Sequence, residues 1–179
     1  MPATDSTPPN PWPGIGLTIT DAPTPTDVSL ISDALDRFNI DTTAIADRRP
    51  LAILARDSRT RQVIGGLTGR TSLGLFLLDL FFLPAELRRG GLGSEILLRA
   101  ENEARARDCR TAVLYTISFQ APGFYAKHGW RPLGEVPCDP PGTSRVFMTK
   151  DLDPPTACEA RSTAVADHPA QQRQEHGPQ

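Results

Sequence analysis

The chain is poor in cysteine and lysine, and it has no apolar run long enough to cross a membrane. Its three cysteines, at positions 109, 138 and 158, are odd in number and lack a Cys-x-x-Cys spacing. This pattern predicts reduced thiols, with neither a disulfide framework nor a metal site. The most apolar run, residues 73–83, is far shorter than the roughly 20 residues that span a bilayer and contains Asp79. Residues 1–13 carry no targeting pattern, so we expect a cytoplasmic protein without membrane partners.

The charge pattern is balanced, and it excludes a polyanion-binding surface. The formal net charge is −2, and the 19 basic residues include only two lysines, Lys127 and Lys150. Arginines are interspersed with acidic residues along the chain, whereas nucleic-acid-binding proteins concentrate basic residues on one face. We therefore expect no nucleic-acid partner.

Proline is abundant, and its distribution defines the domain boundaries. The chain has 18 prolines, but only three fall between residues 26 and 131. Residues 1–13 and 153–179 lack almost every large aliphatic side chain, so burial cannot offset the entropy lost on ordering them. We predict a disordered proline-rich arm at 1–13, one folded domain at 14–152 and a disordered tail at 153–179.

Hydrophobic periodicity predicts alternating strands and helices within residues 14–152. The predicted strands cover residues 15–20, 51–56, 62–71, 74–83, 111–117, 130–136 and 145–150. The predicted helices begin near Thr26-Asp27, Gly91 and Ala121, and they end near residues 40, 108 and 128. A turn at 57–60 makes the first strands antiparallel, whereas a helical crossover makes the strands at 74–83 and 111–117 parallel. The result is an α/β protein with a mixed sheet and helices on both faces.

A glycine-rich segment follows the long central strand and precedes the longest helix. Its residues are Arg88, Arg89, Gly90, Gly91, Leu92, Gly93 and Ser94. Unpaired N–H groups at a helix N-terminus attract anions, and residues without side chains let a phosphate approach them closely. The spacing matches neither the P-loop nor the Gly-x-Gly-x-x-Gly fingerprint. It does match Arg-x-x-Gly-x-Gly.

A second segment, residues 118–130, contains a short helix that ends in Tyr125-Ala126-Lys127-His128-Gly129-Trp130. Together the two segments resemble the GCN5-related N-acetyltransferase (GNAT) superfamily, and the similarity covers residues 14–152. The resemblance implies a three-layer α/β/α sandwich. Its mixed, mostly antiparallel sheet would have about six to seven strands and a splayed central parallel pair.

The resemblance also implies acetyl-CoA as co-substrate and assigns site residues by their match to the family motifs. Backbone groups of Phe82 and Leu83 would pair with the pantetheine arm, and the Leu83 N–H would face the thioester oxygen. Residues 88–94 would hold the pyrophosphate. Tyr125 would protonate the departing thiolate, and Ser118, where many members carry asparagine, would hydrogen-bond to the pantetheine arm.

The base that deprotonates the amine is predicted from the strand pattern. Asp79 is acidic within an apolar strand, and strict alternation puts it on one face with Phe81 and Leu83. Desolvation would make it a better base; the alternative is a structural aspartate at a strand irregularity. Asn39 and Asp41, after the first helix, are candidates for the acceptor pocket. His128 is expected to interact with the dipole of its helix.

These features predict an acetyl-CoA-dependent N-acetyltransferase that acts by direct attack of a primary amine in a ternary complex. A small amine is favoured over a protein acceptor, and a homodimer is possible because edge strands are exposed. The alternative is a non-catalytic acyl-CoA-binding or regulatory domain.

Overall fold

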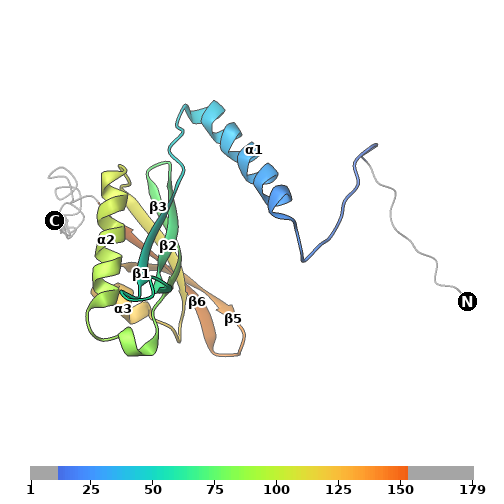
Figure 1. Ribbon diagram of the computed structural model, residues 1–179. Coiled ribbons are helices and arrows are strands. Elements are labelled where there is room, and N and C mark those ends of the chain that lie inside the picture. Colours follow the sequence, from blue (N-terminus) through green and yellow to red (C-terminus); the bar gives the residue numbers. More distant parts are fainter. Residues whose placement is uncertain (1–11, 153–179) are drawn as a thin grey trace, which may run out of the picture. The chain divides into compact units, whose positions relative to one another are not determined.

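The computed structural model describes residues 12–152 and divides the chain into two compact units, separated between Ala46 and Asp47 (Figure 1). The predictions for residues 1–11 and 153–179 therefore lie outside the described residues. No described helix is long and apolar enough to span a membrane.

The first unit contains helix α1, Pro25–Thr43. Its N-cap is Thr24, whose hydroxyl accepts a hydrogen bond from the Asp27 N–H, while the Asp27 carboxylate accepts one from the Thr24 N–H. This reciprocal capping box sets the N-cap at Thr24, two residues before the predicted start at Thr26-Asp27. The strand predicted at 15–20 is wrong: these residues form no strand. Alternation indicates which side chains share a face, but a strand also needs a hydrogen-bonded neighbour.

The second unit is built on a six-stranded sheet with the order β1-β2-β3-β4-β6-β5. The strands are Arg49–Arg56 (β1), Val63–Ser72 (β2), Leu75–Phe82 (β3), Thr111–Ile117 (β4), Arg131–Cys138 (β5) and Thr143–Asp151 (β6). Only the β3–β4 pair is parallel. The helices are α2, Leu92–Ala106, and α3, Pro122–Lys127, and a 3-10 turn covers Ala85–Leu87. The predicted mixed, mostly antiparallel α/β fold is confirmed.

The central parallel pair separates partway along its length. β3 and β4 are paired only from Leu75↔Thr111 to Leu77↔Val113. Beyond Leu77, β3 continues to Phe82 and β4 to Ile117 without pairing to each other. The predicted splay is therefore present, and it leaves backbone N–H and C=O groups of both strands available to a ligand.

A bulge in β3 overturns the strict alternation predicted for this strand. The register with β2 passes from Gly69↔Leu78 to Thr68↔Leu80, so Asp79 has no partner residue. An extra residue reverses which positions face the core. Leu78 is buried before the bulge and Leu83 after it, whereas Leu80 is exposed. Asp79 consequently does not share the face of Leu83.

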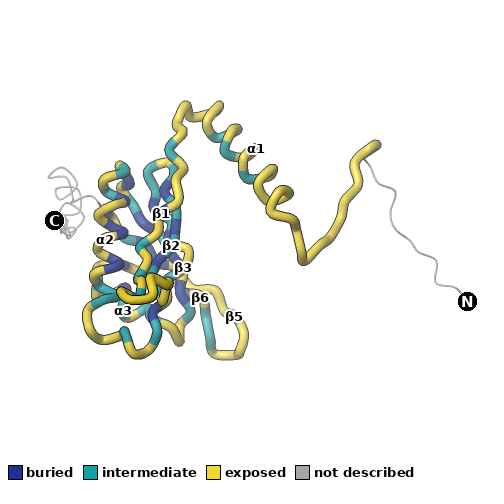
Figure 2. The backbone as a smooth tube through the Cα atoms, viewed as in Figure 1, coloured by how far each residue is buried: buried dark blue, intermediate teal, exposed yellow. Residues whose placement is uncertain are grey.

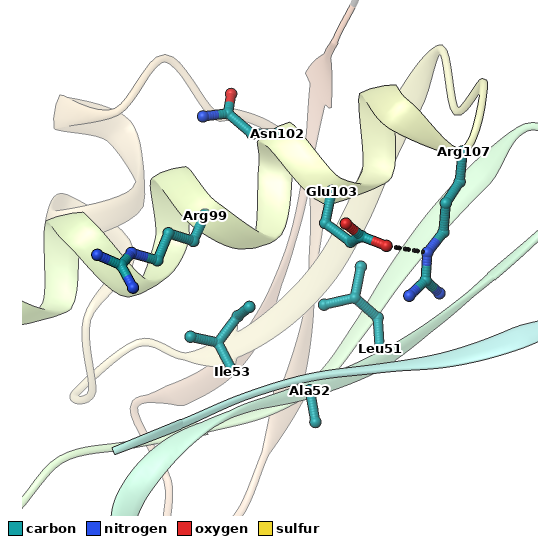
Figure 3. A pocket seen from close by; sticks show the side chains of 7 residues that line it. All are labelled: Leu51, Ala52, Ile53, Arg99, Asn102, Glu103 and Arg107. Atoms are coloured by element: carbon teal, nitrogen blue, oxygen red, sulfur yellow. Dashed lines mark hydrogen bonds and ion pairs between the residues drawn. The ribbon is translucent and has the colours of Figure 1, made fainter. Parts of the chain in front are cut away.

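Helix α2 covers one face of the sheet and forms the core with it (Figure 2). Ile96, Ala100 and Ala104 form an apolar stripe on this helix, and all three are buried. At the end of the helix, Arg107 forms an ion pair with Glu103 at 2.7 Å (Figure 3). Arg107 also donates a hydrogen bond to the Pro50 carbonyl at 2.9 Å. These contacts join α2 to β1 beside a shallow pocket lined by residues of both elements.

Candidate functional site

A cleft of about 840 Å³ lies where β3 and β4 separate. This volume lies within the range of roughly 300–1,000 Å³ that is usual for small-molecule sites. Predicted site residues that line it are Phe82, Leu83, Arg88, Arg89, Gly91, Gly93, Ser94 and Tyr125. The cleft thus brings together the two sequence motifs, residues 88–94 after β3 and residues 118–130 around α3.

The loop between the 3-10 turn and α2 contains a row of backbone N–H groups beside the cleft. Leu87 and Arg88 donate their N–H groups back into the turn, and Glu95 donates to the Gly91 carbonyl. Within the described residues, the N–H groups at 89–94 make no hydrogen bond. Left-handed backbone at Arg89 (φ 68°) and Gly91 (φ 85°) bends this segment into a concave turn. Consecutive N–H groups in such a turn, at the positive end of a helix, form an anion-binding site.

Leu83 lies shortly before this loop, and within the described residues its backbone N–H is free whereas its carbonyl is hydrogen-bonded. Its N–H has no hydrogen-bond partner within residues 12–152. Its carbonyl accepts a hydrogen bond of 2.8 Å from Nε of Arg88, and the Arg88 guanidinium lies 5.9 Å from the centre of the Phe82 ring. Arg88 therefore supports the end of β3, a role that the sequence did not indicate.

Tyr125 of α3 lines the cleft, and the residue is 6% exposed. Burial raises its pKa to about 12, because the charged phenolate loses hydration. The Tyr125 hydroxyl makes no hydrogen bond to a described residue, yet no described buried side-chain N or O lacks a partner. The hydroxyl must therefore face the open cleft. The phenol is protonated at neutral pH and positioned to donate to a ligand.

Ser118 and Asp79 lie away from the cleft lining. The Ser118 hydroxyl accepts a hydrogen bond of 3.1 Å from the Ser144 N–H, which joins the end of β4 to β6. Asp79 is exposed, and both of its carboxylate oxygens accept hydrogen bonds from Nη1 of Arg70, at 2.8 and 2.9 Å. The desolvation expected for Asp79 is not found. Its position at a strand irregularity agrees with the structural alternative.

Two residues of the predicted glycine loop also lie outside the cleft lining. Leu92 is partly buried against the core, and Gly90 is exposed. Asn39 and Asp41 lie within α1 rather than after it, and their role toward an acceptor stays a prediction. The expected dipole interaction of His128 has a counterpart in its Nδ1 contact with the Phe124 carbonyl at 2.8 Å.

Several residues that line the cleft were not predicted as site residues, namely Phe81, Thr116, Phe119, Gln120, Ala121, Phe124 and Lys127. Gln120 closes the end of β4, because its side-chain oxygen accepts hydrogen bonds from the Ile117 N–H at 3.0 Å and the Thr116 hydroxyl at 3.2 Å. Phe124 packs edge-to-face on Phe81 at 5.9 Å and so connects α3 to β3. Most of these residues lie within or beside the 118–130 segment, so their place in that motif could have indicated them as cleft residues.

Comparisons with known proteins agree with the fold. Residues 20–130 match the model of the acetyltransferase (GNAT) family. The chain is 36% identical over 115 residues to a blasticidin-S acetyltransferase of Streptomyces morookaense, covering 62% of this chain and 83% of the relative. It is 32% identical over 120 residues to an acetyltransferase of Agrobacterium fabrum, covering 67% and 87%. A crystal structure assigned as an acetyltransferase, from Agrobacterium tumefaciens, superposes with a TM-score of 0.69 at 28% identity, over 76% of this chain and 99% of the other.

The fold and the family match define the class of protein as an acyltransferase with a splayed mixed sheet. The chain belongs to the acetyltransferase (GNAT) family. The predicted resemblance is thereby confirmed, and the protein is an enzyme of the N-acetyltransferase class.

Proposed function

We propose that the protein transfers an acetyl group from acetyl-CoA to an amine of a small molecule, by direct attack in a ternary complex. The observation that carries this proposal is the cleft at the splay. Leu83, whose N–H is free within the described residues, Tyr125 and residues of the glycine-rich loop all line this one cavity, which supports the proposal.

The chain's own groups suit the co-substrate's chemistry. Acetyl-CoA supplies the acetyl group and, on transfer, a thiolate. The donors at 89–94 would hold the pyrophosphate, and the unpaired strand ends would accept the pantetheine arm. An N–H at the Leu83 position would stabilise the negative charge that develops on the thioester oxygen.

Tyr125 would give its proton to the departing thiolate. Its pKa of about 12 keeps the phenol protonated at assay pH. A thiolate formed in the same desolvated cleft would also be more basic than in water, which narrows the difference in proton affinity between the two groups. The amine must be neutral to attack, and its proton would leave through water or a group on the acceptor side of the cleft.

A small amine acceptor is supported by the relative from Streptomyces morookaense, which is named for blasticidin S and matches this chain over most of its own length. The proposal therefore puts blasticidin S and other amine-bearing antibiotics ahead of peptide N-termini as acceptors.

The test is CoA thiol release from acetyl-CoA across blasticidin S, aminoglycosides, polyamines and short peptides, with acetyl-CoA binding measured by calorimetry. We expect binding without an acceptor and release with one class of small amine. Release with peptides alone would overturn the small-amine proposal. Absence of acetyl-CoA binding would overturn the function assigned to the loop.

A further inference from the structure

A buried carboxylate lies outside the cleft, and the proposed reaction does not use it. Glu101 of α2 is 3% exposed. One carboxylate oxygen accepts a hydrogen bond of 3.0 Å from Nε1 of Trp130, and the other accepts one of 2.6 Å from Nζ of Lys150. A carboxylate is removed from water at high cost unless it is paired in this way. The network joins α2, β6 and the segment that follows α3.

Trp130 in turn holds Tyr125 through both backbone and ring. The chain reverses at Gly129 (φ 81°), and the Trp130 N–H then donates to the Tyr125 carbonyl at 3.1 Å. Trp130 is 2% exposed, and its ring lies edge-on to the Tyr125 ring with 5.9 Å between centroids. The indole is therefore fixed by Glu101 at its nitrogen and contacts the phenol on its ring.

Helix α3 cannot orient Tyr125 by itself. It has six residues and no side-chain N-cap, and helices this short are unstable without tertiary contacts. The Tyr125 hydroxyl has no hydrogen-bond partner within residues 12–152, so nothing fixes the phenol from its polar end. Its direction depends on packing against Phe124, at 5.3 Å, and against Trp130.

We propose that Glu101 and Trp130 are positioning residues for Tyr125, because the Glu101–Trp130 hydrogen bond fixes the indole that sets the direction of the phenol toward the cleft. This inference rests on the proposed function of Tyr125 as the acid. Neither residue lines the cleft, so both act through Tyr125.

The test is a double-mutant cycle with Trp130→Phe, which keeps an aromatic ring and removes the N–H donor. In the wild-type background we expect kcat to fall about 5- to 50-fold, part of the 10²- to 10⁴-fold that a positioned acid contributes. The KM for acetyl-CoA should stay within about 2-fold, because that mutation leaves the loop at 89–94 intact. In a Tyr125→Phe background, the same substitution should change kcat by less than about 2-fold.

A purely structural network gives a different result. It predicts the same fractional loss of kcat in both backgrounds, and that result, or an unchanged kcat in Trp130→Phe alone, would overturn the inference. Wild-type turnover in Tyr125→Phe alone would instead remove the proposed acid itself. The failure of this inference is therefore seen in the Trp130→Phe variants, whereas the failure of the proposed acid is seen in Tyr125→Phe alone.

Two further variants control for stability. Glu101→Gln replaces one carboxylate oxygen by an amide N–H₂, which cannot accept a hydrogen bond from Trp130 or Lys150. This variant takes the place of Trp130→Phe if Trp130→Phe proves too unstable to purify. Its loss of kcat should likewise be seen only when Tyr125 is present. Thr149→Val removes one buried hydrogen bond, from the Thr149 hydroxyl to the Ala112 carbonyl at 2.9 Å, without touching Tyr125. It should lower the melting temperature and leave kcat within about 2-fold; an equal kcat loss in Thr149→Val would show a general effect of stability and overturn the inference.

Discussion

Nε of Arg88 donates a hydrogen bond of 2.8 Å to the carbonyl oxygen of Leu83, five residues earlier in the chain. The adjacent Arg89 has left-handed backbone and lines the same cleft. Two neighbouring arginines in one motif therefore differ in what they contact. Arg88 braces the strand end that carries the proposed oxyanion donor, whereas Arg89 is available to a phosphate.

This difference predicts distinct kinetic effects for two matched variants. Arg88→Gln should lower kcat by about 10-fold, since a misplaced oxyanion donor forfeits part of its 10²- to 10³-fold contribution, and it should also raise the KM for acetyl-CoA. Arg89→Gln should raise that KM and leave kcat within about 2-fold, as expected when only ground-state binding is lost. Steady-state kinetics with varied acetyl-CoA measures both. Identical changes in the two variants would contradict the assignment.

Tyr125→Phe should slow acetyl transfer by about 10- to 1,000-fold, because the thiolate would leave without a proton donor. The affinity for acetyl-CoA should be nearly unchanged, since the phenol contributes no charge to the pyrophosphate loop. Single-turnover rates and calorimetry separate the two effects. An unchanged rate would remove the acid role, and a parallel loss of binding would indicate a structural defect.

The raised pKa of Tyr125 predicts alkaline destabilisation. An ordinary tyrosine titrates near pH 10, and Tyr125 near 12. Below pH 10 the phenol is protonated in both states, whereas between 10 and 12 only the unfolded chain loses the proton, so unfolding becomes easier as pH rises. Across this window the native state should lose about 3 kcal/mol, at about 1.4 kcal/mol per pKa unit. Urea titrations of the wild type and Tyr125→Phe give this difference; a pH-independent difference would contradict the shift.

Gly65 of β2 faces the same strand end from the other side. A Cβ there would lie 2.8 Å from the Phe82 carbonyl oxygen and 3.1 Å from Cδ2 of Leu83. Gly65→Ala should therefore displace the end of β3 and lower kcat about 10-fold, because small errors in placing reacting groups are costly. Gly134→Ala, on the edge strand β5, meets no atom within 4 Å and is the control. Equal activity of the two variants would show that the strand end tolerates the shift.

Asp79→Asn should have small effects on both stability and rate. The carboxylate is exposed and paired with Arg70, and exposed pairs contribute about 0–1 kcal/mol. We expect the free energy of unfolding to change by less than about 1 kcal/mol and kcat to fall less than about 5-fold, below the 10²-fold typical of a lost base. A loss near 100-fold with an altered pH profile would restore Asp79 as the base.

Much of the site could be predicted from the chain because its signals are local. The glycine spacing at 88–94 dictates a tight turn before a helix, and its free N–H groups follow from helix geometry. Residues 83–94 and 118–130 therefore carry the predictions of the loop and the phenol and the resemblance to the family. The predicted ends of β3 and α3 are also close to those observed, because Pro84 and Gly129 interrupt regular structure just after these two elements.

The errors have one physical origin, which is that neighbours across the sheet are invisible to local pattern. The bulge at Asp79 depends on the register with Thr68 and Gly69, so strict alternation put Asp79 on the wrong face. The Ser118 hydroxyl accepts a hydrogen bond from the Ser144 N–H, 26 residues later in sequence, which no local pattern indicates, and its role toward the pantetheine arm stays a prediction. The segment 15–20 alternates as a strand does, yet a strand also requires a partner.

The sequence by itself determined the fold class, the family and the chemical types at the site, since these depend on spacing within short segments. Tertiary structure decided which of those groups are free to react. It separated β3 from β4, tied Arg88 to Leu83, paired Asp79 with Arg70 and placed Trp130 between Glu101 and Tyr125. Each of these depends on hydrogen bonds or packing whose partners only the folded chain brings together.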